Sequence, residues 1–262
     1  MITHSDLGRP SDNETVERRG NTIYFPRSKR ASTPQEKPPP PQQRVANQPG
    51  FQTPDAAFKL IYEAKCRDLK MSKTSNTQCQ RFIDLARVQC QVPRMCLRNQ
   101  GLGTDSAKAI SKMLASVKRY EYLDVSCNQF GDYGAAAIAW LLERDSSLTM
   151  LDYRSNNLGA DGGELIFHAL QTNRSLTAID LSTEPGINRN KVGLRGASGL
   201  AQALEKNHVL CKVDLSQNSV GIAGAEVLGS SLSKNKSLME LKLCANGLGV
   251  AGSSEIPLNG NP

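Results

Sequence analysis

The sequence predicts an α/β solenoid, a fold in which each repeat adds one short strand and one helix to a stack. Three observations predict it: a phrase that returns with a period of 28 residues, an alternating apolar core within each copy, and an Ala/Leu-rich stretch after it. A fixed period of this length is typical of repeat architectures. A stack of such units presents a surface to its partners, so the sequence predicts a binding protein with no deep pocket.

Residues 1–50 are polar and proline-rich, with 8 of the 13 prolines of the chain. A segment with so few apolar side chains cannot bury enough surface to offset the entropy of ordering it, so we expect this leader to be disordered. The run Pro38–Pro41 favours a polyproline II conformation, which SH3 and WW domains bind. A solvated tail is the other interpretation of the same run.

Residues 53–91 read as a helical N-terminal cap. Thr53, Pro54 and Asp55 follow the order in which helices begin, and Asn76 to Gln89 carries apolar residues at helical spacing. Repeat arrays expose an apolar edge at their ends unless a polar-faced element covers it. A partner-binding helical hairpin is the alternative interpretation.

The repeats occupy residues 92–252, and each follows the pattern L-x-x-L-x-L-x-x-N-x-L. About six units are present, the last of them incomplete, and they begin at Val92, Tyr120, Leu148, Leu176, Leu210 and Leu238. The L-x-L core predicts a strand, and the Ala-rich tail predicts a helix. The ninth position is Asn in five units, and we expect these side chains to satisfy backbone groups where the strand turns: Asn128, Asn156, Asn190, Asn218 and Asn246. Gln100 replaces Asn in the first unit.

Glycines also recur near the start of each expected helix, at Gly134, Gly162, Gly196, Gly224 and Gly252. They indicate a tight turn or close packing against the previous coil.

This pattern resembles the leucine-rich repeat family, in particular its ribonuclease-inhibitor-like class with long helical repeats. The resemblance implies a horseshoe with a concave parallel sheet and convex helices. It also implies protein–protein recognition on the concave sheet.

Side chains at positions three, five and seven of each unit are expected to face away from the core and so to form the candidate partner surface. Position five carries a column of four acids, which we expect either to recruit a basic partner segment or to be a common structural choice of the family. The candidate residues are Tyr122, Asp124, Met150, Asp152, Arg154, Asp180, Lys212 and Asp214.

The fourth unit is six residues longer than the others, and the extra residues fall at 183–188, around Pro185 and Gly186. Insertions in solenoids often map to a binding face, so this loop is a second candidate for partner contact. A tolerated change of loop length is the alternative. Residues 253–262 form an irregular tail containing Pro257 and Gly260, which predicts a truncated isoform, a fragment of a longer array, or an edge left for a partner.

No enzyme motif, cofactor motif or metal-ligand spacing is found, so we predict neither catalysis nor a cofactor. The seven cysteines form no CxxC pair, and Cys127, Cys211 and Cys244 fall at different repeat positions, which indicates small packing residues. Residues 1–91 carry +6 of the net charge of +7, and the repeats show no basic face, so no nucleic-acid partner is expected. The sequence contains no apolar run of about 18 residues, so no membrane span is predicted.

An interaction scaffold in the cytoplasm, by analogy in a cilium or the cytoskeleton, is the leading functional hypothesis. Two alternatives stay open. One is a regulator of a small GTPase resembling Ran GTPase-activating proteins, and the other is a detached repeat domain of an immune-receptor-like sensor.

Overall fold

The structure, a computed structural model, describes residues 17–19, 22–24, 54–71, 75–186 and 188–248. Two short strands come first, β1 (Glu17–Arg19) and β2 (Thr22–Tyr24), followed by two helices, α1 (Pro54–Asp68) and α2 (Asn76–Gln89). The repeats then run β3 (Arg94–Cys96), α3 (Thr104–Val117), β4 (Tyr122–Asp124), α4 (Gly131–Leu142), β5 (Met150–Asp152), α5 (Ala160–Leu170), β6 (Ala178–Asp180), α6 (Gly193–Lys206), β7 (Lys212–Asp214), α7 (Gly221–Leu232) and β8 (Glu240–Lys242).

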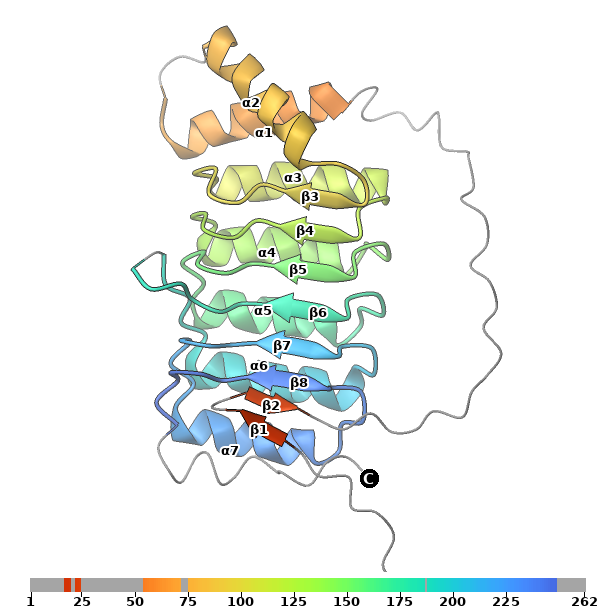
Figure 1. The fold of residues 1–262 in the computed structure, drawn as a ribbon, viewed down its shortest axis with the longest axis vertical. Coiled ribbons are helices and arrows are strands. Elements are labelled where there is room, and N and C mark those ends of the chain that lie inside the picture. The colour runs from red at the N-terminus through yellow and green to blue at the C-terminus, as the bar shows by residue number, and fades with distance from the viewer. Residues whose placement is uncertain (1–16, 20–21, 25–53, 72–74, 187, 249–262) are drawn as a thin grey trace, which may run out of the picture.

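Strands β3 to β8 form a parallel sheet in sequence order, and the helices α3 to α7 cover one of its faces (Figure 1). Pairing is in repeat register throughout: Leu123 lies opposite Leu151, and Leu151 opposite Ile179. The register holds across the long fourth unit, where Ile179 pairs with Val213. The predicted α/β solenoid is therefore confirmed, with a helical pair at its N-terminal end.

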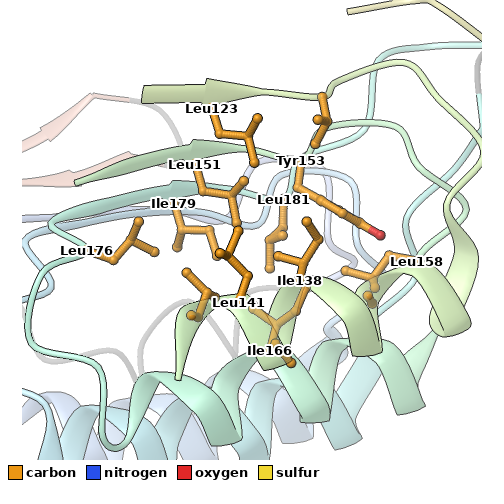
Figure 2. Packing of buried hydrophobic residues seen from close by; sticks show 14 of the residues in the cluster. Leu123, Ile138, Leu141, Leu151, Tyr153, Leu158, Ile166, Leu176, Ile179 and Leu181 are labelled. Carbon is orange, nitrogen blue, oxygen red and sulfur yellow. The ribbon is translucent and has the colours of Figure 1, made fainter. Parts of the chain in front are cut away.

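The core lies between the sheet and the helices. Leu123, Leu151 and Ile179 point from consecutive strands toward Ile138 and Ile166 of the helices, and all five are at most 2 % exposed (Figure 2). Each repeat thus buries its apolar side chains against its neighbours as well as within itself. Stability in such an array accumulates from these interfaces between neighbours.

The asparagines of position nine form a buried ladder, as the sequence predicts. Asn128 donates from Nδ2 to the carbonyls of Leu97 and Val125, at 2.9 and 2.8 Å. Its Oδ1 accepts from the amides of Gln100 and Leu102, both at 3.0 Å. One side chain therefore ties its own turn to the turn of the preceding repeat, and it satisfies backbone groups that water does not reach.

A second buried ladder lies at the other end of the repeats, where each helix returns to the next strand. Asn207 donates to the carbonyls of Leu170 and Asn173 and accepts from the amides of Val209 and Leu210. Asn173 and Asn235 behave alike at the equivalent positions, and Asp145, which has no N–H, makes only the accepting half of the contact, from the amide of Leu148. This ladder is not among the features predicted above, although the sequence carries its signal: an Asp or Asn stands three residues before Leu148, Leu176, Leu210 and Leu238.

The recurring glycines permit close packing, which is one of the two predicted roles. A Cβ on Gly224 would lie 2.5 Å from Val220 Cγ1 and 3.2 Å from Ala197 Cβ of the preceding helix. Gly134 is equally tight, 2.6 Å from Phe130 Cβ. A side chain there would push the helix away from its own turn and its neighbour. Gly252 lies outside the described residues.

The helical cap is fastened to the first repeat by one carboxylate. Asp68, the last residue of α1, accepts from the backbone amides of Gly103, Asp105 and Ser106, at 2.8 to 3.0 Å. These are amides of the first turn of α3, which no side chain of its own caps. A negative charge at a helix N-terminus satisfies its unpaired N–H groups and complements the helix dipole.

The expectation that the whole of residues 1–50 is disordered is wrong for β1 and β2. These strands form an antiparallel hairpin, and β2 pairs antiparallel with β8 at the C-terminal edge of the sheet, with Ile23 opposite Leu241 (Figure 1). The physical reason is that an edge strand presents unpaired N–H and C=O groups, which another segment satisfies whatever its side chains are. Composition predicts disorder here because it does not include the free energy gained from backbone pairing at a sheet edge.

The remainder of the leader, including Pro38–Pro41, and the tail at residues 253–262 lie outside the described residues. Across the part of the chain that is described, no helix is long and apolar enough to span a membrane.

Replacing Ile23 with Pro should detach the hairpin, because proline in a middle strand removes a ladder hydrogen bond. We expect amide hydrogen exchange at Glu240–Lys242 to become faster by about tenfold, since the stability of an edge is local. Exchange in β4 and β5 serves as the internal control and should not change. Unaltered exchange in β8 would contradict the pairing.

Candidate protein-binding surface

The sheet face opposite the helices carries two rows of side chains, which together we name the sheet face. Position three of the repeats supplies the first row, with neighbours in register: Arg94, Tyr122, Met150, Ala178, Lys212 and Glu240. Position five supplies the second: Cys96, Asp124, Asp152, Asp180, Asp214 and Lys242. The described helices of the repeats lie behind the strands, so they leave this face open (Figure 1).

The centre of the first row is apolar. Met150 is 46 % exposed, although its neighbours in the same strand, Leu151 and Asp152, are buried. Tyr122 lies beside it, with the guanidinium of Arg94 stacked 4.7 Å from the ring centroid. Partial burial raises the pKa of the Tyr122 hydroxyl, and nearby Asp124 adds to the shift. Tyr122, Met150 and the small Ala178 thus form a continuous apolar strip across three strands.

The acids of the second row point back into the ends of their own strands. Asp124 Oδ1 accepts from the amide of Ser126 at 2.9 Å and from its hydroxyl at 2.6 Å. Asp180 and Ser182 repeat the arrangement, and Asp214 accepts from the amide of Ser216. These are side-chain turns that hold the strand ends in shape.

Two of these acids are too buried to act as a free acidic stripe. Asp124 and Asp152 are 7 % and 6 % exposed, and both oxygens of Asp152 accept from Arg154. Reversing the charge of Asp152 would therefore place a second cation against the guanidinium of Arg154 at a buried position, and we expect such a change to destabilise the fold. The structural interpretation of the acidic column accounts for these contacts.

Asp180 is the acid whose ionisation the fold resists. Burial raises its pKa to about 6, and the charges of Asp214 and Asp152 in the adjacent strands add to the shift. Hydrogen bonds from Ser182 act in the opposite direction. Because its pKa in the unfolded chain is the ordinary 3.8, the ionised carboxylate destabilises the folded state above pH 6.

Asp180→Asn should stabilise the protein at pH 7, because the amide oxygen keeps the bond to Ser182 while the charge is removed. We expect a gain of about 1 kcal/mol in the free energy of unfolding, discounted for the partial exposure of the side chain. The gain should shrink below pH 6 and vanish below about pH 4. Urea titrations of both proteins from pH 4 to pH 8 measure it, and a pH-independent difference would argue against the assignment.

The cations on and beside the sheet face are, except for Arg154, more exposed than the acids there. The side chains of Lys212, Lys242, Arg98 and Arg154 are 30 to 59 % exposed, whereas those of Asp152, Asp180, Glu184, Asp214 and Glu240 are 8 to 33 % exposed. An approaching partner therefore meets positive charge first. Counting charges along the sequence could not show this, because the two signs are almost balanced in number.

The insertion in the fourth unit folds back over the earlier repeats. Glu184 accepts from Arg98 Nη2 with both oxygens, at 2.7 and 2.9 Å, and lies 3.4 Å from Arg154 Nη1. Arg98 belongs to the first unit, so a single side chain joins units one, three and four. The hydrogen bonds from Arg98, with the charges of Arg98 and Arg154 adding to them, hold the pKa of Glu184 below its usual value.

Asn188 strengthens the same contact, donating from Nδ2 to the carbonyl of Asn128 at 2.6 Å. Pro185 and Gly186 form the exposed tip of this loop, and Gly186 has a φ of +83°. The insertion thus links repeats to one another, a role that neither sequence interpretation anticipated. Glu184 and Arg98 could not be paired from the sequence, because 86 residues separate them.

Glu184→Gln should lower the free energy of unfolding at pH 7 by about 1 kcal/mol, since a bidentate charged pair becomes a neutral hydrogen bond. The lowered pKa means that the contribution of Glu184 is complete above its unfolded value of 4.5 and is lost as the pH falls through the folded value. The difference in stability between the two proteins should therefore shrink as the pH falls below 4.5. Lys234→Gln, at a surface pair on the helical side, is the control and should change little.

Within the described residues, no group of three or more His, Cys, Asp and Glu side chains is placed to hold a metal ion. The seven cysteines are all unpaired, and His168 and His208 are exposed on the surface. Burial raises the pKa of several thiols, that of Cys90 to about 12.

Comparison with known proteins agrees with the repeat pattern. A family model described as Leucine Rich repeat matches residues 121–139. No curated protein matches the sequence significantly. Similar solved structures include "Leiomodin-1 Actin-Binding Site 2 (ABS2)", with 21 % identity, a TM-score of 0.41, and coverage of 46 % of this chain and 68 % of that chain. Another is the tropomodulin C-terminal domain of Caenorhabditis elegans, with 15 % identity, a TM-score of 0.46, and coverage of 67 % and 92 %.

The repeat match and the succession of strand, asparagine-capped turn and helix define the class. The chain has the fold of a leucine-rich repeat solenoid, with a family match over residues 121–139.

Proposed function

We propose that this protein is a non-catalytic interaction scaffold that binds a protein partner on the sheet face. The observation that carries the proposal is the apolar strip of Tyr122, Met150 and Ala178, in which Met150 is 46 % exposed on a face that the helices leave open. A large apolar side chain at the centre of a sheet, with charged residues around it, has the anatomy of an interface core and rim.

Further support comes from the rigidity of this face. The Asn ladders hold the turns next to the strands through hydrogen bonds to the backbone. Glu184 joins units one, three and four at the margin of the sheet face. A preformed surface loses little conformational entropy on binding, which favours affinity. The helical side also exposes apolar residues, including Tyr133 and Trp140 of α4, but Trp140 lies under the guanidinium of Arg144.

Met150→Glu should abolish partner capture, because a carboxylate would be placed in the apolar centre of the interface. The measurement is affinity capture of the full chain from native cells followed by quantitative mass spectrometry. We expect proteins bound by the unmodified chain to fall by about tenfold or more, as for other central interface residues.

Tyr133→Glu is the matched control, since it introduces the same charge at an 82 % exposed residue on the helical side. Capture by this variant should remain within twofold of the unmodified chain, and both variants should keep their thermal stability. Loss of partners with Tyr133→Glu and retention with Met150→Glu would place the interface on the helices and refute the proposal.

The polyproline contact stays a separate prediction. Removing residues 1–50 would also remove β1 and β2, so the appropriate variant replaces Pro38–Pro41 with alanine and leaves the hairpin in place. The small-GTPase and immune-sensor alternatives, and a ciliary or cytoskeletal location, likewise stay predictions.

A further inference from the structure

We propose that the partner segment is an amphipathic helix that lies along the position-three row, with an apolar face at its centre and acidic residues near both ends. This inference rests on the proposed function and specifies the chemistry of the partner. It depends on three features of the described residues: the spacing of the position-three row, the pairing of the sheet edges, and the exposure of the charged side chains.

The spacing of the row favours a helix. Adjacent strands lie about 4.8 Å apart, so Tyr122, Met150 and Ala178 present contact points at that interval. A helix advances about 1.5 Å per residue, so one contact point corresponds to about 3.2 residues, close to its i, i+3 and i+4 neighbours. An extended segment repeats its side chains on one face about every 6.6 Å, so its spacing does not match the row beyond one strand.

The sheet edges argue against strand addition as the way of binding. An extended partner gains most of its affinity from backbone pairing at a free sheet edge. At the C-terminal edge β8 is already paired with β2, and at the N-terminal end α2 packs close to β3. The face of the sheet offers no backbone groups, because its strands pair with one another. Recognition on the sheet face therefore depends on side chains, and a partner helix presents its own side chains in a row.

The charges set the sign of the partner. Arg94 precedes the apolar strip in the row and Lys212 follows it, and both residues are exposed. They stand four strand spacings apart, about 19 Å, which corresponds to about 13 residues of helix. Asp124, Asp180 and Asp214 are hydrogen-bonded at the strand ends. Glu240, the next residue of the row, lies 3.4 Å from Lys212 Nζ, but its side chain is 14 % exposed against 59 % for Lys212. Acidic residues about 13 positions apart on the partner helix would meet these two cations, whereas basic residues would be repelled first.

A selection experiment tests this inference directly. A displayed library of random 18-residue peptides is selected on the full chain, and binders that also bind the Met150→Glu variant are discarded. We expect the remaining peptides to carry apolar residues at i, i+3 or i+4, and i+7, with Asp or Glu toward both ends. Circular dichroism should show that they become helical when bound.

A separate variant tests whether binding requires the two cations of the row. Arg94→Gln together with Lys212→Gln should weaken the selected peptides by about tenfold and reduce the dependence of their affinity on salt. Lys234→Gln with Lys108→Gln neutralises two cations at 70 % and 57 % side-chain exposure, one in the turn after α7 and one on α3, and it should have no effect.

The outcomes separate the two proposals. Met150-dependent peptides that are basic, or that bind in an extended form, would overturn this inference and leave the sheet face as the binding surface. An absence of Met150-dependent peptides would overturn the inference, while native partners lost on Met150→Glu would still support the proposed function.

Discussion

The in-register stacking of short strands is the constraint on which the rest of this structure depends. Each strand has only three residues, too few to fix its own position by pairing alone. Buried asparagines at both ends of the repeats supply the missing specification, since Asn128 and Asn207 each bond to backbone groups of two successive units. A slip of one residue would leave these amides buried and unpaired, which costs more than the pairing gains.

Register has a direct consequence for binding. Because successive units are aligned residue for residue, one sequence position becomes one row on the surface. Tyr122, Met150 and Ala178 come from three different repeats, yet they form a strip with the spacing of the strands themselves. The same alignment brings Asp152, Asp180 and Asp214 side by side, and the pKa of Asp180 is raised chiefly by burial, with the charges of its two neighbours adding to the shift. The same alignment of the repeats therefore produces both the apolar strip and the electrostatic cost at Asp180.

Two segments that break the repeat pattern act over long distances. The hairpin of β1 and β2 closes an edge of the sheet formed more than 200 residues later, and the insertion returns from the fourth unit to Arg98 of the first. A solenoid otherwise contacts only its nearest neighbours. Both contacts add coupling that the repeats alone lack, and the second also places an ion pair at the margin of the sheet face.

The sequence by itself determined the repeat architecture, the cap helices, the first Asn ladder and the rows that face outward. These follow from local periodicity, because apolar spacing and a recurring Asn specify the same unit each time, as the match between the expected and observed α2 shows. The sequence could also have revealed the second ladder, from the Asp or Asn before each opening Leu. Only the tertiary structure decided the pairing of β2 with β8, the contact of Glu184 with Arg98, and which charges protrude. Those depend on the distance between residues far apart in the chain and on the depth of each side chain, neither of which a linear pattern contains.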